Sequence, residues 1–183
     1  MNKLVKIDQR QISPWQTYAD ETLASAICGD LLLCRKGKWT RGEDDRSVPI
    51  GTRLLCNMLE VWTGWVRWWN NSRVEYRIGR LVDFPPKLLR EDLGHLDQSL
   101  WETDPQGNPR DPWSPMDRII MRDMNGELLT YDTSSWGGRK AVAKLCRDFD
   151  REYNKHDGTW PVVELGSKDR RSPDYGLIPE PVA

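Results

Sequence analysis

Residues 53–82 constrain the fold of this chain most strongly, because they predict three β-strands in succession. Val, Ile, Tyr and Trp, residue types that favour strands, are frequent in segments 64–69 and 74–82, and segment 53–60 is a largely apolar run. Asn70-Asn71-Ser72 separates the second segment from the third with turn-forming residues. Strands that tight turns connect pair in an antiparallel meander. The sequence therefore predicts an antiparallel β-sheet as the framework.

Further strands are predicted on both sides of this meander. Residues 29–34 form a short apolar strand, a basic turn follows at 35–38, and the polar stretch 40–47 is typical of a mobile loop. A hairpin is expected at 118–132, with a type I′ turn at Asn125-Gly126. Towards the end of the chain we predict a strand at 161–165, a polar turn at 166–173 and an edge strand at 175–179.

One α-helix is predicted, from Arg139 to Tyr153. Thr133-Ser134-Ser135 offers N-cap residues, and Asp157-Gly158 ends the helical pattern. Apolar side chains at helical spacing give the helix one buried face, and these are Val142, Leu145, Cys146, Phe149 and Tyr153.

The length of 183 residues fits one domain. We predict an N-terminal arm at 1–27 and a single β-barrel domain at 28–183, interrupted by an irregular insertion at about 83–116. That insertion is rich in Pro, Asp and Gly, and each residue before a proline is disfavoured in helical geometry. Trp101 and Trp113 are expected to hold it against the rest of the domain.

Four tryptophans, at positions 62, 65, 68 and 69, make the middle of the meander a candidate binding surface. Alternation along a strand places Trp65, Arg67 and Trp69 on one face and Trp68 on the other. Bases stack on aromatic rings, and cationic side chains neutralise phosphates. We therefore predict a nucleic-acid-binding site formed by Lys36, Lys38, Trp39, Trp65, Arg67, Trp68, Trp69, Arg73, Arg77 and Arg80.

The distribution of charge agrees with a polyanion bound on one side. The net charge is only −1, yet residues 61–90 hold six basic and two acidic side chains, whereas residues 91–133 hold three basic and ten acidic ones. Two other interpretations remain open. The tryptophans can pack together in a core with arginine stems over them, or they can anchor a protein partner.

A second candidate anion site lies at the start of the predicted helix. Free backbone N–H groups at a helix N-terminus can hold a phosphate, and Gly138, Arg139 and Lys140 stand there. Ordinary helix capping explains the same residues. The spacing of a P-loop is absent.

The sequence offers little for catalysis. Four carboxylates, Asp104, Asp111, Asp117 and Asp123, are conceivable magnesium ligands of a metal-dependent nuclease, but their spacing matches no nuclease pattern. His95 and His156 are expected in exposed positions. The four cysteines form no Cys-x-x-Cys pair, so we predict reduced thiols and no zinc site. No catalytic residue, metal or cofactor is therefore predicted.

Composition indicates a soluble, cytoplasmic protein. The mean hydropathy is −0.72, and no apolar run approaches the roughly 18 residues that span a bilayer. The first eleven residues lack the apolar stretch of a signal peptide. We predict no membrane partner.

Several short segments between residues 29 and 179 resemble those of a known protein family. These are Lys36-Gly37, Pro49-Ile50-Gly51-Thr52, Gly64-Trp65-Val66-Arg67-Trp68, Asp92-Leu93-Gly94, Asp111-Pro112-Trp113, Ser134-Ser135-Trp136-Gly137-Gly138 and Pro161-Val162-Val163-Glu164-Leu165. The chain resembles a family of uncharacterised proteins encoded by phages and prophages of proteobacteria, and its predicted strand order resembles an OB-type barrel. The resemblance implies a phage setting and brings no catalytic residues with it.

Together these patterns predict a mainly β (α+β) fold, an antiparallel OB-like β-barrel with one principal α-helix and a long Pro/Asp-rich loop. The leading functional hypothesis is a non-enzymatic single-stranded DNA-binding protein of phage replication or recombination, able to form homo-oligomers and to meet replication or recombination proteins. The alternatives are a protein–protein interaction module and, third, a metal-dependent nuclease.

Overall fold

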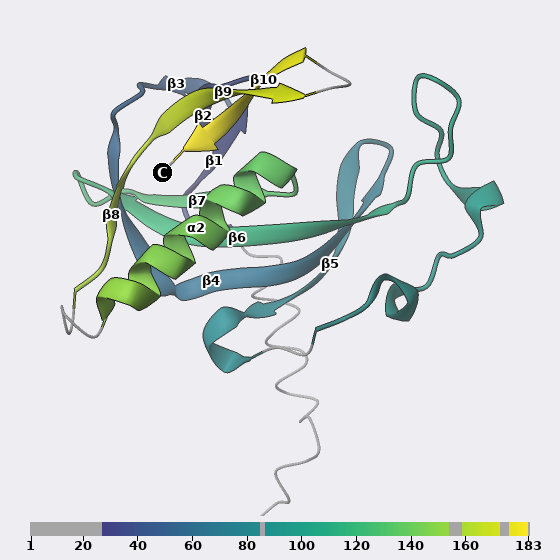
Figure 1. Ribbon diagram of the computed structural model, residues 1–183, viewed down its shortest axis with the longest axis horizontal. Helices are drawn as coiled ribbons and strands as arrows, with labels where there is room; N and C mark the ends of the chain where they lie inside the picture. Colours follow the sequence, from purple (N-terminus) through teal and green to yellow (C-terminus); the bar gives the residue numbers. More distant parts are fainter. Residues whose placement is uncertain (1–26, 85–86, 154–158, 173–175, 183) are drawn as a thin grey trace, which may run out of the picture.

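A curled β-sheet, covered on one face by a long helix, forms the framework of the protein (Figure 1). A computed structural model describes residues 27–84, 87–153, 159–172 and 176–182. The strands of the sheet are β1 (Asp30–Arg35), β2 (Lys38–Arg41), β3 (Arg46–Val48), β4 (Arg53–Trp69), β5 (Ser72–Arg80), β6 (Trp113–Asp123), β7 (Leu128–Thr133) and β8 (Val162–Glu164). The helix is α2 (Trp136–Tyr153).

The strand order is β3-β2-β1-β7-β6-β4-β5, and β8 pairs with the beginning of β4. Neighbours are antiparallel except β1 and β7, which run parallel. Strands β9 (Gly166–Ser172) and β10 (Gly176–Val182) form a separate two-stranded sheet. The mainly β fold with one principal helix is confirmed. The closed barrel is wrong, because β3 and β5 at the two ends of the order do not pair with each other.

Two hairpins follow directly from residues that tolerate left-handed backbone. Lys36 and Gly37 have φ values of 49° and 76° between β1 and β2, and Asn70 and Asn71 have 49° and 58° between β4 and β5. Two consecutive positive φ angles are the signature of the two-residue type I′ turn, whose twist matches that of the flanking strands. Both turns lie where the sequence predicted them.

Strand β4 is one continuous strand of 17 residues, so the predicted turn between residues 60 and 64 is wrong. The chain instead bulges there, since the pairing with β6 shifts between Cys56 and Val61. Bulges bend a strand and increase its twist. The bulge therefore lets β4 bend with the curling sheet and still pair with β6 on both sides of the bulge.

An ion pair across the sheet shows how strongly it curls. Arg73 on β5 donates to Asp132 on β7 at 2.6 Å, although β4 and β6 lie between these two strands. Three strand spacings amount to roughly 14 Å in a flat sheet, which is beyond the combined reach of the two side chains. The tip of the β4–β5 hairpin therefore folds over the face of the sheet opposite to α2, and the sheet is a half-barrel.

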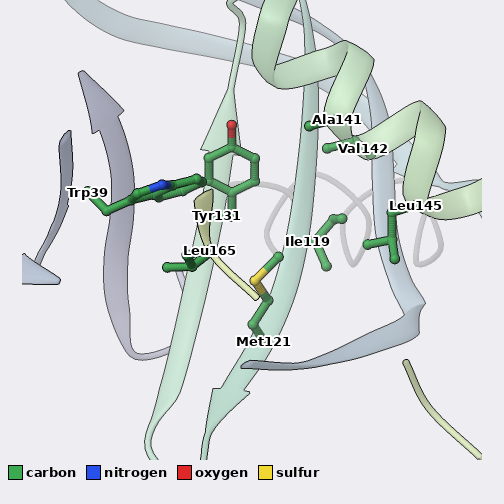
Figure 2. A pocket seen from close by; sticks show the side chains of 8 residues that line it. All are labelled: Trp39, Ile119, Met121, Tyr131, Ala141, Val142, Leu145 and Leu165. Atoms are coloured by element: carbon green, nitrogen blue, oxygen red, sulfur yellow. The ribbon is translucent and has the colours of Figure 1, made fainter. Parts of the chain in front are cut away.

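The main apolar core lies between α2 and the helix face of the sheet. Helix residues Val142 and Leu145 pack against Ile119 of β6 and Tyr131 of β7, and the remaining gap of about 10 Å³ accommodates at most one water molecule (Figure 2). Ser135 caps the helix, because its hydroxyl accepts from the backbone N–H of Gly138 at 3.0 Å. The predicted helix and its cap are thus confirmed, with the start at Trp136.

Three local predictions differ from the structure. Of the mobile loop predicted at 40–47, residues 40–41 belong to β2 and residues 46–47 to β3, and only 42–45 form the turn between them. The polar turn predicted at 166–173 is occupied by β9. The turn at Asn125-Gly126 is not type I′, because only Gly126 of residues 123–126 has a positive φ, 90°. The N-terminal arm, apart from Ile27, lies outside the described residues.

Residues 81–112, here called the excursion, connect β5 to β6, and their described part, 81–84 and 87–112, holds no strand of the main sheet. Three short 3-10 helices lie in that part, η1 (Leu81–Asp83), η2 (Arg90–Leu93) and η3 (Gln98–Leu100). Strand β6 begins at Trp113, so the excursion ends before residue 116, where the predicted insertion ends.

Candidate binding surfaces

The tryptophans predicted to stack on bases differ widely in exposure. Trp39 is 3% exposed, its indole N–H donates to the carbonyl of Gly166 at 2.9 Å, and its ring packs against Tyr131. Trp39 is therefore a core residue, and its assignment to a binding site is wrong. It points inward because the β1–β2 hairpin turns that face of β2 towards the core.

The remaining three tryptophans of the predicted site lie at the far end of β4. Trp65 is half-buried and donates its indole N–H to the carbonyl of Leu88 in the excursion at 3.1 Å. Trp68 is half-buried, and the guanidinium of Arg73 lies 5.1 Å from its ring centre. Trp69 is 46% exposed. Of the three, only Trp69 offers a largely open ring.

Each arginine of the predicted site forms an ion pair with a carboxylate. Arg67 and Arg77 both contact Glu75, at 2.9 and 2.8 Å. Arg80 contacts Asp83 at 2.8 Å and Glu60 at 3.5 Å. Together with the cluster around Asp132, described next, five arginines face four carboxylates, a net charge of +1. The basic surface predicted for a polyanion is thus largely neutralised within the protein.

The most buried charges lie inside the curl of the half-barrel. The side chain of Asp132 is 0% exposed, and its Oδ2 accepts from Arg73 at 2.6 Å and from Arg118 at 3.0 Å. Arg118 is itself buried, and its guanidinium lies 5.2 Å from the ring centre of Tyr76. Removing one member of such a buried group leaves an uncompensated charge. This cluster therefore joins β5, β6 and β7, and it is structural.

The second predicted anion site, at the start of α2, is closed. A Cβ atom on Gly138 would lie 2.1 Å from Thr133 Oγ1 and 2.6 Å from the hydroxyl of Tyr131, and the N–H of Gly138 already bonds Ser135. Arg139 contacts Asp117 at 3.5 Å, and Lys140 lies 4.7 Å from the ring centre of Trp136. The N–H of Gly138 is thus already used by the helix cap, and phosphate binding at this site remains a prediction that these contacts do not favour. Lys36 and Lys38 remain exposed on the β1–β2 hairpin.

Asp117 is a buried carboxylate beneath the same helix start. Thr63 donates to it at 2.8 Å from β4. Burial raises the pKa of the Asp117 carboxyl, and the bonds from Thr63 and Arg139 offset this only in part. Ionisation of Asp117 therefore opposes folding.

This burial predicts a pH dependence of stability. Where the folded pKa is raised, the native state binds more protons than the unfolded chain, so stability falls as pH rises from the ordinary aspartate value of about 3.9 through the raised one. We expect the wild type to lose stability relative to Asp117→Asn over this interval, as measured by urea unfolding from pH 3 to 7. Asp97→Asn is the opposite control, because hydrogen bonds from Ser99 lower the pKa of Asp97. If the stability of the wild type relative to each of the two variants changed in the same direction as pH rises, the prediction would be contradicted.

The four carboxylates considered for a magnesium site lie in separate places. Asp104 accepts bonds within its own loop, Asp111 pairs with Arg90, and Asp123 pairs with Arg41. Asp117 pairs with Arg139 as described. Within the described residues, no group of three or more His, Cys, Asp or Glu side chains could hold a metal ion. His95 is exposed next to buried Trp113, and His156 lies outside the described part of the chain.

All four cysteines are free thiols. Cys56 is buried, and burial raises the pKa of its thiol to about 12. Burial also raises the thiol pKa of the half-buried Cys34 and Cys146. Cys28, in contrast, is exposed.

The excursion reverses the usual distribution of polar and apolar side chains. Its polar groups bond inward: Arg90 donates to Asp111 at 2.7 Å and to the carbonyls of Gly94 and His95, and Trp101 donates to His95 at 2.7 Å. Six of its large apolar side chains face solvent, with Phe84 91% and Leu100 73% exposed, while Leu88, Leu93 and Trp101 are half-buried. We call the six exposed side chains together the excursion patch, although they are distributed along the excursion from η1 to η3 (Figure 1): Leu81, Val82, Phe84, Leu89, Leu96 and Leu100. Sequence reasoning missed this surface, because the leucines alternate with charged residues as they do in many solvated loops.

None of the helices among the described residues is long and apolar enough to cross a membrane. Comparisons of the chain with known protein families, with curated proteins and with solved structures found no match.

Proposed function

We propose that this protein is a non-enzymatic docking module that binds another protein through the excursion patch. The observation that carries the proposal is the inverted arrangement of the excursion, whose polar side chains hold its backbone while its leucines and Phe84 remain exposed. Exposed apolar surface framed by polar residues is typical of protein interaction sites. An ordinary solvated loop would present the opposite arrangement.

The charge around the patch defines the kind of partner. Residues 81–112 hold seven acidic and three basic side chains, a balance of −4. A partner that complements this surface has apolar side chains at the centre of its interface and basic ones at the rim. The same negative balance disfavours nucleic acid on this side of the molecule.

The double substitution Leu96→Ser/Leu100→Ser tests the patch. Both side chains are exposed, so we expect the free energy of unfolding to change by about 0.5 kcal/mol or less per site. Partner binding should fall at least about tenfold, because apolar anchors carry most of the affinity of such interfaces. The measurement is photo-cross-linking from a benzophenone side chain at Phe84 to proteins of a host lysate.

The matched control is Ile50→Ser/Met124→Ser, which removes two side chains of similar exposure outside the excursion. A discrete cross-linked protein that is lost with the leucine variant and kept with the control supports docking. Cross-links that are equal in both variants would reject the patch as the docking surface.

Single-stranded DNA binding is the second candidate. Two exposed rings favour it: Trp69, and Trp136 with the ammonium group of Lys140 above its ring. Titration with oligothymidine at two salt concentrations separates the candidates. Strong, salt-sensitive quenching of tryptophan fluorescence that Trp69→Ala abolishes would favour DNA, whereas a docking module shows none.

A further inference from the structure

The two ends of the sheet differ in how well they are protected from pairing with another strand. β3 has three residues, whereas β5 has nine and contains neither proline nor lysine. Natural edge strands are usually short, or carry charged side chains, proline or bulges that discourage pairing. β5 has its bulge at one end, at Val74, and its central charges, Glu75 and Arg77, are of opposite sign. Among the described residues, β5 pairs with β4 alone, so its outer edge presents unpaired backbone groups.

The side chains of β5 form a self-complementary series. From Val74 to Ile78 the order is apolar, acidic, aromatic, basic, apolar, in the sequence Val-Glu-Tyr-Arg-Ile. In an antiparallel pair of two such strands centred on Tyr76, Glu75 of each copy lies opposite Arg77 of the other, and Val74 lies opposite Ile78. Cross-strand pairs of opposite charge and of apolar side chains are favourable.

Neighbouring registers with a twofold axis do not share this complementarity. Centring the pair on Glu75 places the two glutamates opposite each other and Arg73 opposite Arg77. Centring it on Arg77 places the two arginines opposite each other. Like charges directly opposite destabilise a sheet, so the register around Tyr76 is favoured.

The side chains of this segment are accessible. Val74 is 46% exposed, and the side chain of Arg77 is 52% exposed. Val74 is the extra residue of the bulge in the β4–β5 pairing, since Arg67 pairs with Glu75 and Trp68 with Arg73. The bulge ends regular pairing on that side and confines the contact to about five residues on each strand.

We propose that two copies of this chain associate through β5 in antiparallel register centred on Tyr76, so that one sheet continues across a twofold axis. The partner is a second copy because a twofold interface must be self-complementary, and β5 meets that requirement in both its charges and its apolar side chains. This association uses the edge of β5 and not the excursion patch. A result that rejects the dimer therefore does not reject the docking function, and the reverse also holds.

Mixed cysteine cross-linking tests both the dimer and its register. Val74→Cys and Ile78→Cys are prepared separately in the full chain with Cys28→Ser, which removes the exposed thiol. Two copies of residue 74 lie roughly 13 Å apart along the strands in this register, whereas residues 74 and 78 lie opposite each other. We expect a disulfide dimer when the two variants are mixed under mild oxidation, at up to half of the protein, and none with either variant alone.

Sedimentation velocity completes the test by measuring the oligomeric state of the Cys28→Ser variant, with and without Val74→Lys. Lysine at the edge should shift the protein from dimer to monomer, while Ser47→Lys on the opposite edge strand β3 leaves the dimer unchanged. A monomer at every concentration up to about 100 μM, far above the protein concentrations at which specific dimers form, would overturn the proposal. Cross-links with Val74→Cys alone would overturn the register.

Discussion

We expect the Asp132→Asn substitution to lower the free energy of unfolding by about 3–5 kcal/mol, the range found when one member of a buried ion pair is removed. Asp132 supplies the carboxylate between Arg73 and Arg118, and its side chain is fully buried. Asparagine keeps the size of the side chain but removes the charge. Two guanidinium groups then share the interior of the half-barrel without the carboxylate that offsets them.

Urea unfolding followed by tryptophan fluorescence measures this loss. The control is Asp45→Asn, because Asp45 also pairs with an arginine, Arg35, but both side chains are more than half exposed. Exposed pairs contribute at most about 1 kcal/mol. If the two variants lost similar amounts of stability, the cluster would not hold the curl of the sheet.

The same cluster shows where sequence reasoning succeeds and where it fails. The hairpin turns at Lys36-Gly37 and Asn70-Asn71 and the capped helix were predictable, because each depends on residues within a few positions. Arg73 and Asp132, in contrast, are 59 residues apart, and Trp39 bonds a carbonyl 127 residues away. No local pattern indicates such a partner.

This difference also changes the meaning of the basic stretch at 61–90. Counted along the chain, its arginines outnumber its carboxylates and predict a polyanion-binding surface. In the fold, Glu75 and Asp83 of the same stretch and the preceding Glu60 bond these arginines. Asp132, from the acidic stretch 91–133, bonds Arg73. Counting charged residues along the sequence therefore overstates the positive charge that the folded surface presents to a ligand.

In the excursion, the sequence indicates the path of the chain but not which side chains are exposed. Its irregular path was predictable from its prolines, and Trp113 is buried as expected of a residue that holds it to the domain. The exposure of Leu89, Leu96 and Leu100 was not predictable, because no local pattern separates them from the half-buried Leu88 and Leu93. Nor did the sequence indicate that Arg90 would bond Asp111 and two carbonyls of the loop.

The second large effect is expected at Gly64, in the middle of β4. Its φ is 150°, and a Cβ atom there would lie 2.1 Å from the carbonyl oxygen of Arg77 and 2.9 Å from the Cα of Ile78 on β5. Both are backbone atoms of a paired strand, so they cannot move aside as a side chain can. We expect Gly64→Ala to lower the free energy of unfolding by about 3 kcal/mol, at the upper end of the cost of overpacking.

The control for Gly64→Ala separates steric contact from backbone strain. Gly107 also has a positive φ, 86°, yet a Cβ atom there would meet nothing within 4 Å. Gly107→Ala should therefore cost only about 1 kcal/mol, from conformational strain alone. Equal losses in the two variants, measured by urea unfolding, would mean that β4 and β5 do not approach so closely at Gly64. A larger loss at Gly64 would identify this glycine as the point where a continuous 17-residue strand can pass close to its neighbour and let the half-barrel curl.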